Sequence, residues 1–408
     1  MISQQLNIYG QTIPTIPKTE GIKYAGSKLK MLPYILGILN DLEGVKNVLD
    51  GFSGSTRVSQ AFAQLGYNTT SSDIAMWSEV LATCYLRSSK SNEFYQKIID
   101  HLNNLKGYDG WYTEHYGAEL SGTKRPFQAK NTRKLDAIRD EIENLSLEWA
   151  DKCMILTSLI YALDSVDSTL GHYVSYLSEW SSRSHKDMVM KLPHRFECTG
   201  ETKVIRGDIF ESISNNEFDF VYFDPPYGSN NEKMPPSRVR YASYYHIWTT
   251  IINHDKPIVF GKANRREDSR DQVSASVFEE FRKDESGSFI AMQALRSLIQ
   301  KTKSRYILLS YSSGGRTTKQ ELNDIINESG KLLKAIEIDY KKNVMGNMRW
   351  TNEWINSNGK HHEYLFLMEK KKSLPNRAKL IVSPAATRKL KIVQKPPKGA
   401  KFHEHASV

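Results

Sequence analysis

The segment FDFVYFDPPYG, residues 218–228, decides the fold because it combines a buried strand with an abrupt, rigid end. FVYF is a continuous apolar run, which is typical of a strand covered on both faces in a parallel sheet. Pro225 and Pro226 have restricted backbone angles and no amide hydrogen, so they end the strand and stiffen the turn behind it. Asp224 is therefore presented at the carboxyl end of the strand, close to the ring of Tyr227.

An acid beside an aromatic ring at a strand end suits a flat heterocycle that carries an amino group. The carboxylate of Asp224 and the neighbouring carbonyls are hydrogen-bond acceptors, and Tyr227 offers a face for stacking. Adenine or cytosine taken out of a helix has this chemistry. The alternative, a proline-terminated strand with a surface tyrosine, explains the two prolines but not the acid and the ring that bracket them.

A strand-turn-helix-strand unit is predicted upstream, over residues 45–73. Its loop DGFSGST, residues 50–56, follows the first strand, where ligands of open α/β sheets bind and where glycine allows close approach. The loop matches neither the dinucleotide nor the phosphate fingerprint, so alone it is equally an ordinary turn. Asp73 ends the second strand and is placed either to bind ribose hydroxyls or to cap the following helix.

A third strand end carries GDIF, residues 207–210. In a nucleoside site, Asp208 would bind an adenine amine while Ile209 or Phe210 packs against the ring. The alternative is a turn aspartate followed by core residues.

The order of expected elements predicts an open α/β sheet that is interrupted by an insert. Five later segments are predicted strands: KVIRGDIF, FDFVYFDPPYG, KPIVFGKA, RYILLSYSS and HEYLFLMEKK. Residues 77–197 break the alternation and predict an inserted, mainly helical module. We therefore expect a lead-in at 1–20, a discontinuous α/β domain at 21–76 and 198–370, the insert, and a disordered basic tail at 371–408.

Composition narrows the functional classes. The chain of 408 residues has no run of eighteen apolar residues and no leader-like start, so we expect neither a membrane span nor secretion. Its dispersed cysteines, Cys84, Cys153 and Cys198, argue against disulfides or a zinc site and favour the cytoplasm. The eleven Lys or Arg residues between 370 and 403 are enough to account for the whole net charge of +10, so the basicity of the chain belongs to this tail. Such a tail is either a solvated appendage or a phosphate-binding arm.

These motifs together resemble a known family. DPPY after an apolar strand, DGFSGS at 50–55 and KYAGSK at 23–28 resemble motifs IV, I and X of the amino-methyltransferases, in the order of the alpha class. The chain resembles the Dam-like DNA adenine N6-methyltransferases of restriction-modification systems over about residues 22–370. SRVRYASYYHIW at 237–248, DSVDSTLGHY at 164–173 and HHEYLFL at 361–367 are similar to further segments of that group.

The resemblance implies a Rossmann-like mixed sheet with helices on both faces and a helical target-recognition insert. It implies S-adenosylmethionine as cofactor and S-adenosylhomocysteine as product, without a metal. The residues implied to hold the target base are Asp224, Pro225, Pro226 and Tyr227. The residues implied to hold the cofactor are Lys23, Tyr24, Ala25, Gly26, Lys28, Asp50, Phe52, Ser53, Gly54, Ser55, Asp73, Asp208, Ile209, Phe210 and Asp224.

Two positions depart from the family pattern. Thr56 stands where the family loop has a glycine, and a positive φ there would be costly for threonine. Residues 228–232 also differ from the DPPYN start that is common in the family, so the residue that flanks the base is left open.

Duplex DNA is the implied partner, together with a cognate restriction endonuclease, in a bacterial, archaeal or viral cytoplasm; we expect a monomer or weak dimer. The candidate DNA contacts are Arg125, Lys130, Arg133, Lys134, His172, Tyr173, Arg183, Arg240, Tyr241 and Tyr244, each of which is alternatively a solvated or structural residue. GKANRRED at 261–268 is a second basic candidate, whose acids alternatively pair with its own arginines. Methylation of cytosine N4, of RNA or of a protein amide, and an inactive DNA-binding relative, remain as alternative functions.

Overall fold

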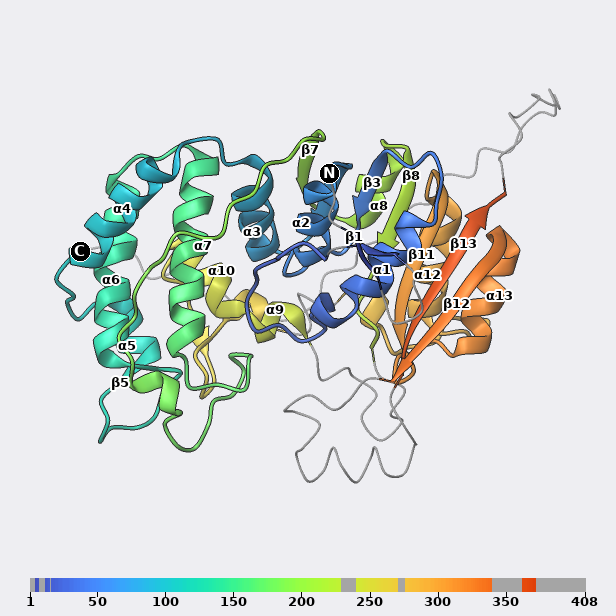
Figure 1. The fold of residues 1–408 in the computed structure, drawn as a ribbon. Helices are drawn as coiled ribbons and strands as arrows, with labels where there is room; N and C mark the ends of the chain where they lie inside the picture. The colour runs from blue at the N-terminus through green and yellow to red at the C-terminus, as the bar shows by residue number, and fades with distance from the viewer. Residues whose placement is uncertain are drawn as a thin grey trace, which may run out of the picture. The chain divides into compact units, whose positions relative to one another are not determined.

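A seven-stranded sheet in the order β12-β13-β11-β8-β3-β4-β7 forms the centre of the computed structural model (Figure 1). Its strands, in chain order, are β3 (Asn47–Asp50), β4 (Asn68–Asp73), β7 (Thr202–Arg206), β8 (Phe218–Phe223), β11 (Ser304–Ser312), β12 (Gly330–Asp339) and β13 (His362–Lys370). The neighbours from β11 to β7 are parallel, whereas β13 is antiparallel to both β11 and β12. The predicted mixed α/β sheet is confirmed.

The structure describes residues 4–6, 12–14, 16–228, 240–270, 276–339 and 362–371. The predicted tail beyond Lys371, most of the lead-in and the segment after Gly228 lie outside these residues.

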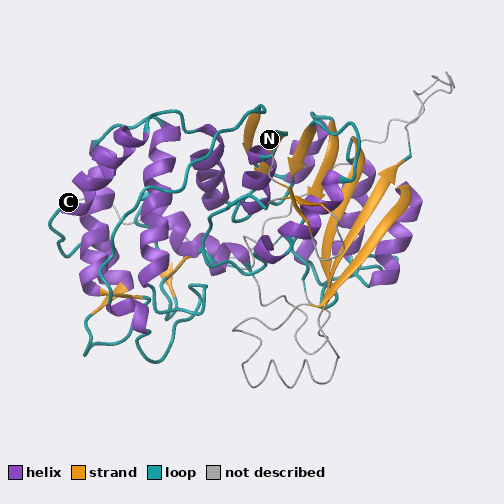
Figure 2. Cartoon of the chain, viewed as in Figure 1, coloured by secondary structure: helices purple, strands orange, loops and turns teal. Residues whose placement is uncertain are grey.

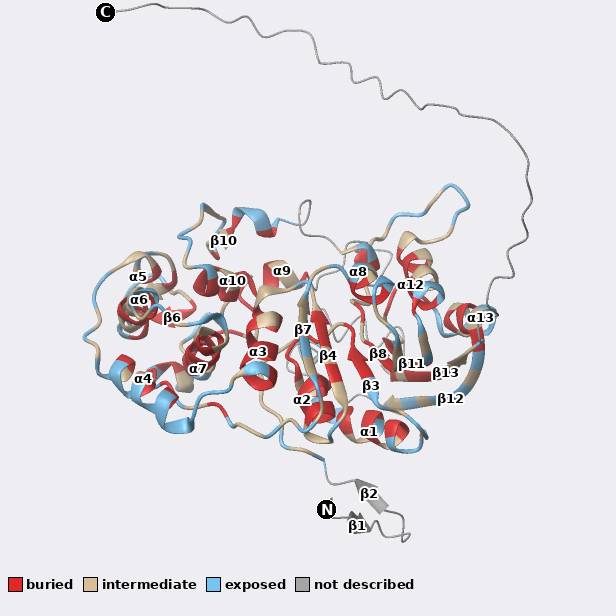
Figure 3. Ribbon diagram, turned by 90° about the horizontal axis from the view of Figure 1, so that it is seen from above, coloured by how far each residue is buried: buried red, intermediate tan, exposed pale blue. Residues whose placement is uncertain are grey.

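Helices cover both faces of the sheet, as expected (Figure 2). On one face lie α1 (Leu32–Asn40) and α2 (Arg57–Gln64); on the other lie α8 (Ile209–Ser214), α12 (Ile290–Lys301) and α13 (Lys319–Ser329). Successive side chains of a strand point to opposite faces, so Phe220 and Tyr222 of β8 pack with the first layer and Val221 and Phe223 with the second. The buried central strands are visible in Figure 3.

The helical module contains α3 (Met76–Arg87), α4 (Asn92–Asn104), α5 (Trp111–Tyr116), α6 (Ala129–Asn144) and α7 (Trp149–Val166). α7 is apolar around most of its surface, which is typical of a helix at the centre of a core. The same core includes residues of α9 (Tyr241–Tyr244) and α10 (His246–Asn253), among them Trp248. The helices that follow the DPPY corner therefore pack within this module, and the boundary predicted at residue 197 stays a prediction.

One predicted strand is wrong as a member of the sheet. In KPIVFGKA only β9 (Val259–Phe260) is extended, and it pairs with β10 (Arg265–Arg266) in a separate hairpin. Gly261 and Asn264 have φ values of 69° and 48°, so the chain turns back directly after the two residues of β9. Arg266 then pairs with Asp255 and Asp268, as the alternative interpretation of this basic segment expected.

The remaining elements are short. They are β1 (Gln4–Leu6), β2 (Thr12–Pro14), β5 (Gly117–Ala118), β6 (Phe127–Gln128) and the 3-10 turns η1 (Lys28–Lys30), η2 (Ser182–His185), η3 (Glu267–Ser269) and η4 (Val277–Glu279). Among the described residues, no helix combines the length and apolar character needed to cross a membrane.

Candidate functional site

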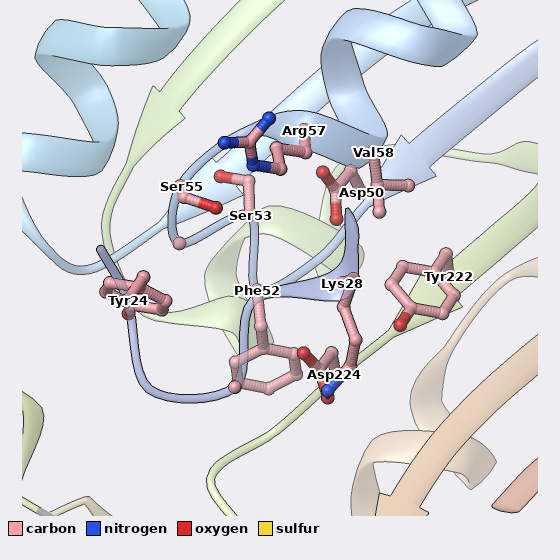
Figure 4. A pocket seen from close by; sticks show the side chains of 12 residues that line it. Tyr24, Lys28, Asp50, Phe52, Ser53, Ser55, Arg57, Val58, Tyr222 and Asp224 are labelled. Carbon is pink, nitrogen blue, oxygen red and sulfur yellow. The ribbon is translucent and has the colours of Figure 1, made fainter. Parts of the chain in front are cut away.

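The carboxyl ends of the parallel strands meet at one edge of the sheet and line a pocket (Figure 4). The free space at its centre is about 20 Å³, which is room for about one water molecule. The lining residues are Tyr24, Gly26, Lys28, Asp50, Phe52, Ser53, Gly54, Ser55, Arg57, Val58, Tyr222 and Asp224. The structure thus brings the KYAGSK segment, the loop after β3 and the DPPY corner to one place.

The loop after β3 runs close to its neighbours because it contains glycine. A Cβ atom on Gly51 would lie 2.6 Å from the ring of Phe223, and one on Gly54 would lie 3.0 Å from the ring of Tyr24. Gly54 also has a φ of 49°, which disfavours other residues. Asp73 fixes the loop, because its Oδ2 accepts a 2.8 Å hydrogen bond from Gly54 N.

Asp73 ends β4 as predicted and turns the chain into α3. Its Oδ1 accepts a hydrogen bond from Ala75 N at 2.8 Å, so both oxygens are bound to backbone amides. Burial raises the pKa of Asp73, although these amide hydrogen bonds act in the opposite direction. Asp73 is half-buried, and binding of ribose remains a prediction for it.

Asp50 is a buried acid at the end of β3. Its Oδ2 accepts hydrogen bonds from Ser59 N at 2.9 Å and Ser59 Oγ at 2.6 Å, which caps the first turn of α2. Burial raises the pKa of Asp50 to about 7, against the lowering effect of these two bonds. Arg57 lies on the same turn, and its Nε is buried without a hydrogen-bond partner among the described residues.

Thr56 has a left-handed backbone conformation, the one expected to be costly for threonine. Its φ is 62° and its side chain is fully buried, where Thr56 Oγ1 accepts a hydrogen bond from Gln60. Left-handed backbone costs a non-glycine residue about 1–2 kcal/mol, and the chain carries this strain beside the pocket.

The DPPY corner holds a buried cluster of charges that sequence reasoning missed. Lys28 Nζ lies 2.9 Å from Asp224 Oδ1 and 3.0 Å from Glu363 Oε1, and it donates a 2.8 Å hydrogen bond to the Tyr227 hydroxyl. Figure 4 shows the Lys28 nitrogen beside the Asp224 carboxylate. Lys28 was predicted to enclose the cofactor; it lines the pocket, but its ammonium binds the two acids at the corner.

Tyr227 belongs to the same cluster. Its hydroxyl donates a 2.5 Å hydrogen bond to Glu363 Oε1 and contacts Asp224 Oδ1. Its ring lies 4.9 Å from that of Tyr311. Burial, followed by the charges of Asp224 and Glu363, raises the pKa of Tyr227, so the hydroxyl stays protonated.

Burial and neighbouring charges compete to set the pKa values of the two carboxylates in the cluster. It raises the pKa of Asp224 to about 6, although the charge of Lys28 opposes the shift. For Glu363 burial is outweighed by Lys28, Tyr227 and Ser310, and its pKa is lowered. Lys28 keeps its proton because Asp224 and Glu363 overcome the effect of burial and raise its pKa.

The GDIF segment begins α8, and Asp208 is its N-cap. Asp208 Oδ1 accepts a 2.7 Å hydrogen bond from Phe210 N, which confirms the turn role weighed for it, while its exposed side chain leaves the adenine role as a prediction. Ile209 is buried in the core, and Phe210 stacks on Phe278 at 6.0 Å.

The KYAGSK segment connects the pocket to the helical module. Lys23 forms ion pairs with Asp164 and Asp167, and is therefore directed away from the loop after β3. Tyr24 stacks on Tyr245 at 4.7 Å and on Tyr241 at 5.4 Å. The Tyr245 hydroxyl accepts a 2.7 Å hydrogen bond from Ala25 N, and Tyr241 donates to Ala25 O.

Three of the predicted DNA contacts have their side chains inside the core, and their contact with DNA stays a prediction. His172, Tyr173 and Tyr244 are 5%, 1% and 7% exposed, and the ring of Tyr173 packs 4.9 Å from that of Trp248. These side chains therefore present little surface to a base edge in this structure. Tyr241 is half-buried in the aromatic stack described above.

Most of the basic candidates have intramolecular partners. Arg133 binds Asp109 and Glu119, Lys130 binds Asp187, Lys134 donates to backbone carbonyls, and Arg183 binds Asp167. Arg240 is buried beside Glu279. Arg125 differs, because it is half-exposed and forms no hydrogen bond or ion pair within the described part of the chain.

Comparison with known proteins places this geometry in a family. The chain is 27% identical over 377 residues to the modification methylase StsI of Streptococcus sanguinis, covering 87% of this chain and 53% of that protein. It is 24% identical over 362 residues to the type II methyltransferase M.NlaIII of Neisseria lactamica, covering 86% of this chain and 99% of that protein. It is 25% identical over 382 residues to the type II methyltransferase M.FokI of Planomicrobium okeanokoites, covering 88% and 54%.

The chain thus spans about half the length of StsI and M.FokI and nearly all of M.NlaIII. A family model matches residues 24–313, which include the pocket loop, the DPPY corner and the helical module. The chain belongs to the D12 class of N6 adenine-specific DNA methyltransferases.

Proposed function

We propose that this chain transfers a methyl group from S-adenosylmethionine to the N6 amine of an adenine in a short sequence of duplex DNA. The observation that carries the proposal is the largely buried Asp224, held at a rigid proline corner beside the loop after β3, in a chain of this family. We further propose that it is the modification enzyme of a type II restriction-modification system, because its relatives are named as modification or type II methylases.

The residues around the pocket fit a nucleoside cofactor that carries an amino-acid part. Asp73, which binds the pocket loop at Gly54, would accept from ribose hydroxyls, and the loop at 50–55 would enclose the methionine part. Asp208, the exposed N-cap of α8 outside the pocket lining, would accept from the adenine amine. The buried Nε of Arg57 has no partner in the described residues, which suits a carboxylate. Such a ligand needs at least ~300 Å³, so we propose that Tyr24 moves away from Gly54 when it binds.

The bound cofactor supplies a methyl group on a positively charged sulfur. Asp224 and the Pro225 carbonyl would accept hydrogen bonds from the adenine amine, whose lone pair is otherwise delocalised into the ring. These bonds hold the nitrogen in line with the methyl carbon, and catalysis is mainly orientation and electrostatics. Transfer would form a bond between the amine nitrogen and the methyl carbon and break the bond from that carbon to sulfur, and the amine would then release one proton to water.

The base must leave the helix to reach this corner, and Tyr227 would support it there. Arg125 is the strongest candidate for a DNA contact in the helical module, because it carries a charge that no described residue neutralises. A cytoplasmic location, a monomer or weak dimer, and a cognate restriction endonuclease belong to the same proposal.

Transfer of tritium from labelled cofactor to unmethylated plasmid DNA tests the proposal. We expect incorporation into duplex DNA, with N6-methyladenine as the product after digestion. Sequencing of DNA from expressing cells, with adenine modification detected at each site, would then give the recognition sequence. Label in cytosine, in RNA alone or in no nucleic acid would contradict the proposal.

A further inference from the structure

Glu363 reaches the DPPY corner from the last strand of the described sheet. It lies on β13, the antiparallel strand beside β11, and its side chain is 9% exposed. Its Oε1 accepts hydrogen bonds from Tyr227 at 2.5 Å and from Ser310 Oγ at 3.1 Å, and pairs with Lys28 at 3.0 Å. A carboxylate with three donors at one buried oxygen is held in a fixed place.

The donors of the cluster are fully used. Lys28 has three ammonium hydrogens and three acceptors within 3.0 Å, namely Asp224, Glu363 and Tyr227. The Tyr227 hydroxyl has one hydrogen but lies within reach of both carboxylates, so it can donate to only one of them at a time. Glu363 is thus a second acceptor for the same hydrogen.

This arrangement leaves Asp224 able to change partners. Lys28 and Tyr227 both contact Oδ1 of Asp224, and Oδ2 has no hydrogen-bond partner in the described residues. If an amine bound Asp224, the Tyr227 hydroxyl and one hydrogen of Lys28 could remain on Glu363. The ring of Tyr227 and the ammonium of Lys28 would therefore keep their positions while Asp224 turns to the substrate.

We propose that Glu363 is a positioning residue for methyl transfer, which acts by holding Lys28 and Tyr227 around Asp224. The inference rests on the proposed function, since it concerns the same corner. Glu363 also places a negative charge beside Asp224, which favours the protonated form of that acid. Removal of this charge should therefore make Asp224 easier to ionise.

Glu363→Gln is the test variant, because it keeps the shape and an acceptor oxygen but removes the charge. We expect kcat to fall roughly 10- to 100-fold, as for a misplaced reacting group, while the KM for S-adenosylmethionine stays near the wild-type value. The acidic limb of the kcat profile should move to lower pH. Glu369→Gln is the matched control, because Glu369 is on the same strand but pairs with Arg305 at the surface.

Glu363→Asp distinguishes the effect of the side chain's charge from the effect of its length. It keeps the charge and shortens the side chain, so kcat should fall while the acidic limb stays near its wild-type position. Fluorescence of 2-aminopurine at the target site reports whether Tyr227 still supports the extruded base. The melting temperature reports folding of each variant.

An unchanged kcat and pH profile in Glu363→Gln would overturn the inference. So would a loss of activity that follows a lower melting temperature and weaker cofactor binding, with an unshifted acidic limb, because that pattern indicates a purely structural role. If the wild-type protein itself transfers no methyl group to DNA, the proposed function fails first and the inference fails with it.

Discussion

The ammonium of Lys28 lies 2.9 Å from Oδ1 of Asp224, which joins the KYAGSK segment directly to the acid at the DPPY corner. Both side chains are largely buried, so the pair is little screened by solvent. The ion pair offsets part of the cost of keeping a carboxylate in the interior, and the pKa of Asp224 of about 6 reflects the balance.

Methyl transfer should therefore depend on pH near neutrality. An ionised Asp224 accepts hydrogen bonds from the amine, so kcat should rise as pH increases through about 6. Lys28→Met removes the positive charge and raises the pKa of Asp224, so the rise of kcat should move to higher pH. Initial rates between pH 5 and 9 check this. If kcat rises at the same pH in the variant, the ionisation that is observed is not that of Asp224.

Asp224→Asn should remove activity without removing the cofactor. The amide cannot present the same charged acceptor to the adenine amine, so we expect a loss of about 10²- to 10³-fold in kcat. Cofactor affinity by calorimetry should change little, because the loop at 50–55 is unaltered. Turnover close to wild type would contradict the role of the corner.

Tyr227 contributes a ring and a hydroxyl, and two variants separate them. Tyr227→Phe keeps the stacking face but loses the bonds to Glu363 and Lys28, so it should extrude the base and transfer methyl slowly. Tyr227→Ala should also lose stabilisation of the extruded base, by about 1–3 kcal/mol. Fluorescence of 2-aminopurine measures extrusion, and equal signals for both variants would exclude stacking on this ring.

Asp50 should show a conflict between stability and ligand binding. In the folded chain its carboxyl keeps a proton up to about pH 7, whereas in the unfolded chain it ionises near pH ~4. The native state then binds more protons in this window, so the free energy of unfolding falls as pH rises through it.

Asp50→Asn removes this cost and keeps an acceptor for Ser59. It should be more stable than wild type at pH 8, on the order of 1–3 kcal/mol, and equal to it below pH 4. Its cofactor affinity should be lower. Denaturant unfolding at both pH values gives the answer, and a variant that is less stable at pH 8 would refute the account.

Thr56 offers a test of backbone strain. Thr56→Gly and Thr56→Ala both lose the bond to Gln60, but only glycine adopts a φ of 62° without cost. The glycine variant should be more stable than the alanine variant by about 1–2 kcal/mol. Thermal unfolding of the pair tests this, and equal midpoints would mean that the loop relaxes elsewhere.

Local sequence pattern was sufficient for much of the fold. Apolar runs, glycine and proline act over a few residues, so they can be recognised in the sequence. They were enough to predict the unit from β3 to β4, the strand before the prolines, and the acids at 50, 73 and 224. KPIVFGKA was misjudged because its apolar letters resemble a sheet strand, while two left-handed residues decide the turn.

Glu363 and the roles of His172 and Tyr173 depend on contacts between distant segments. Nothing near HHEYLFL shows that its acid pairs with Lys28, since that pairing arises only when β13 joins β11. Polar aromatic residues are likewise equally suited to a DNA surface and to a core. Only the fold shows that Tyr173 packs against Trp248 in the core. The helical core, rather than any short motif, decides these positions.

The placement of β13 has a consequence for protein synthesis. Lys28 and Asp224 leave the ribosome well before Glu363, and β12 has no partner in the main sheet until β13 follows it. A nascent or prematurely terminated chain therefore holds the two earlier charges without the third. The proposed methyl transfer would therefore depend on completion of the sheet, and fragments that end before residue 363 should be inactive.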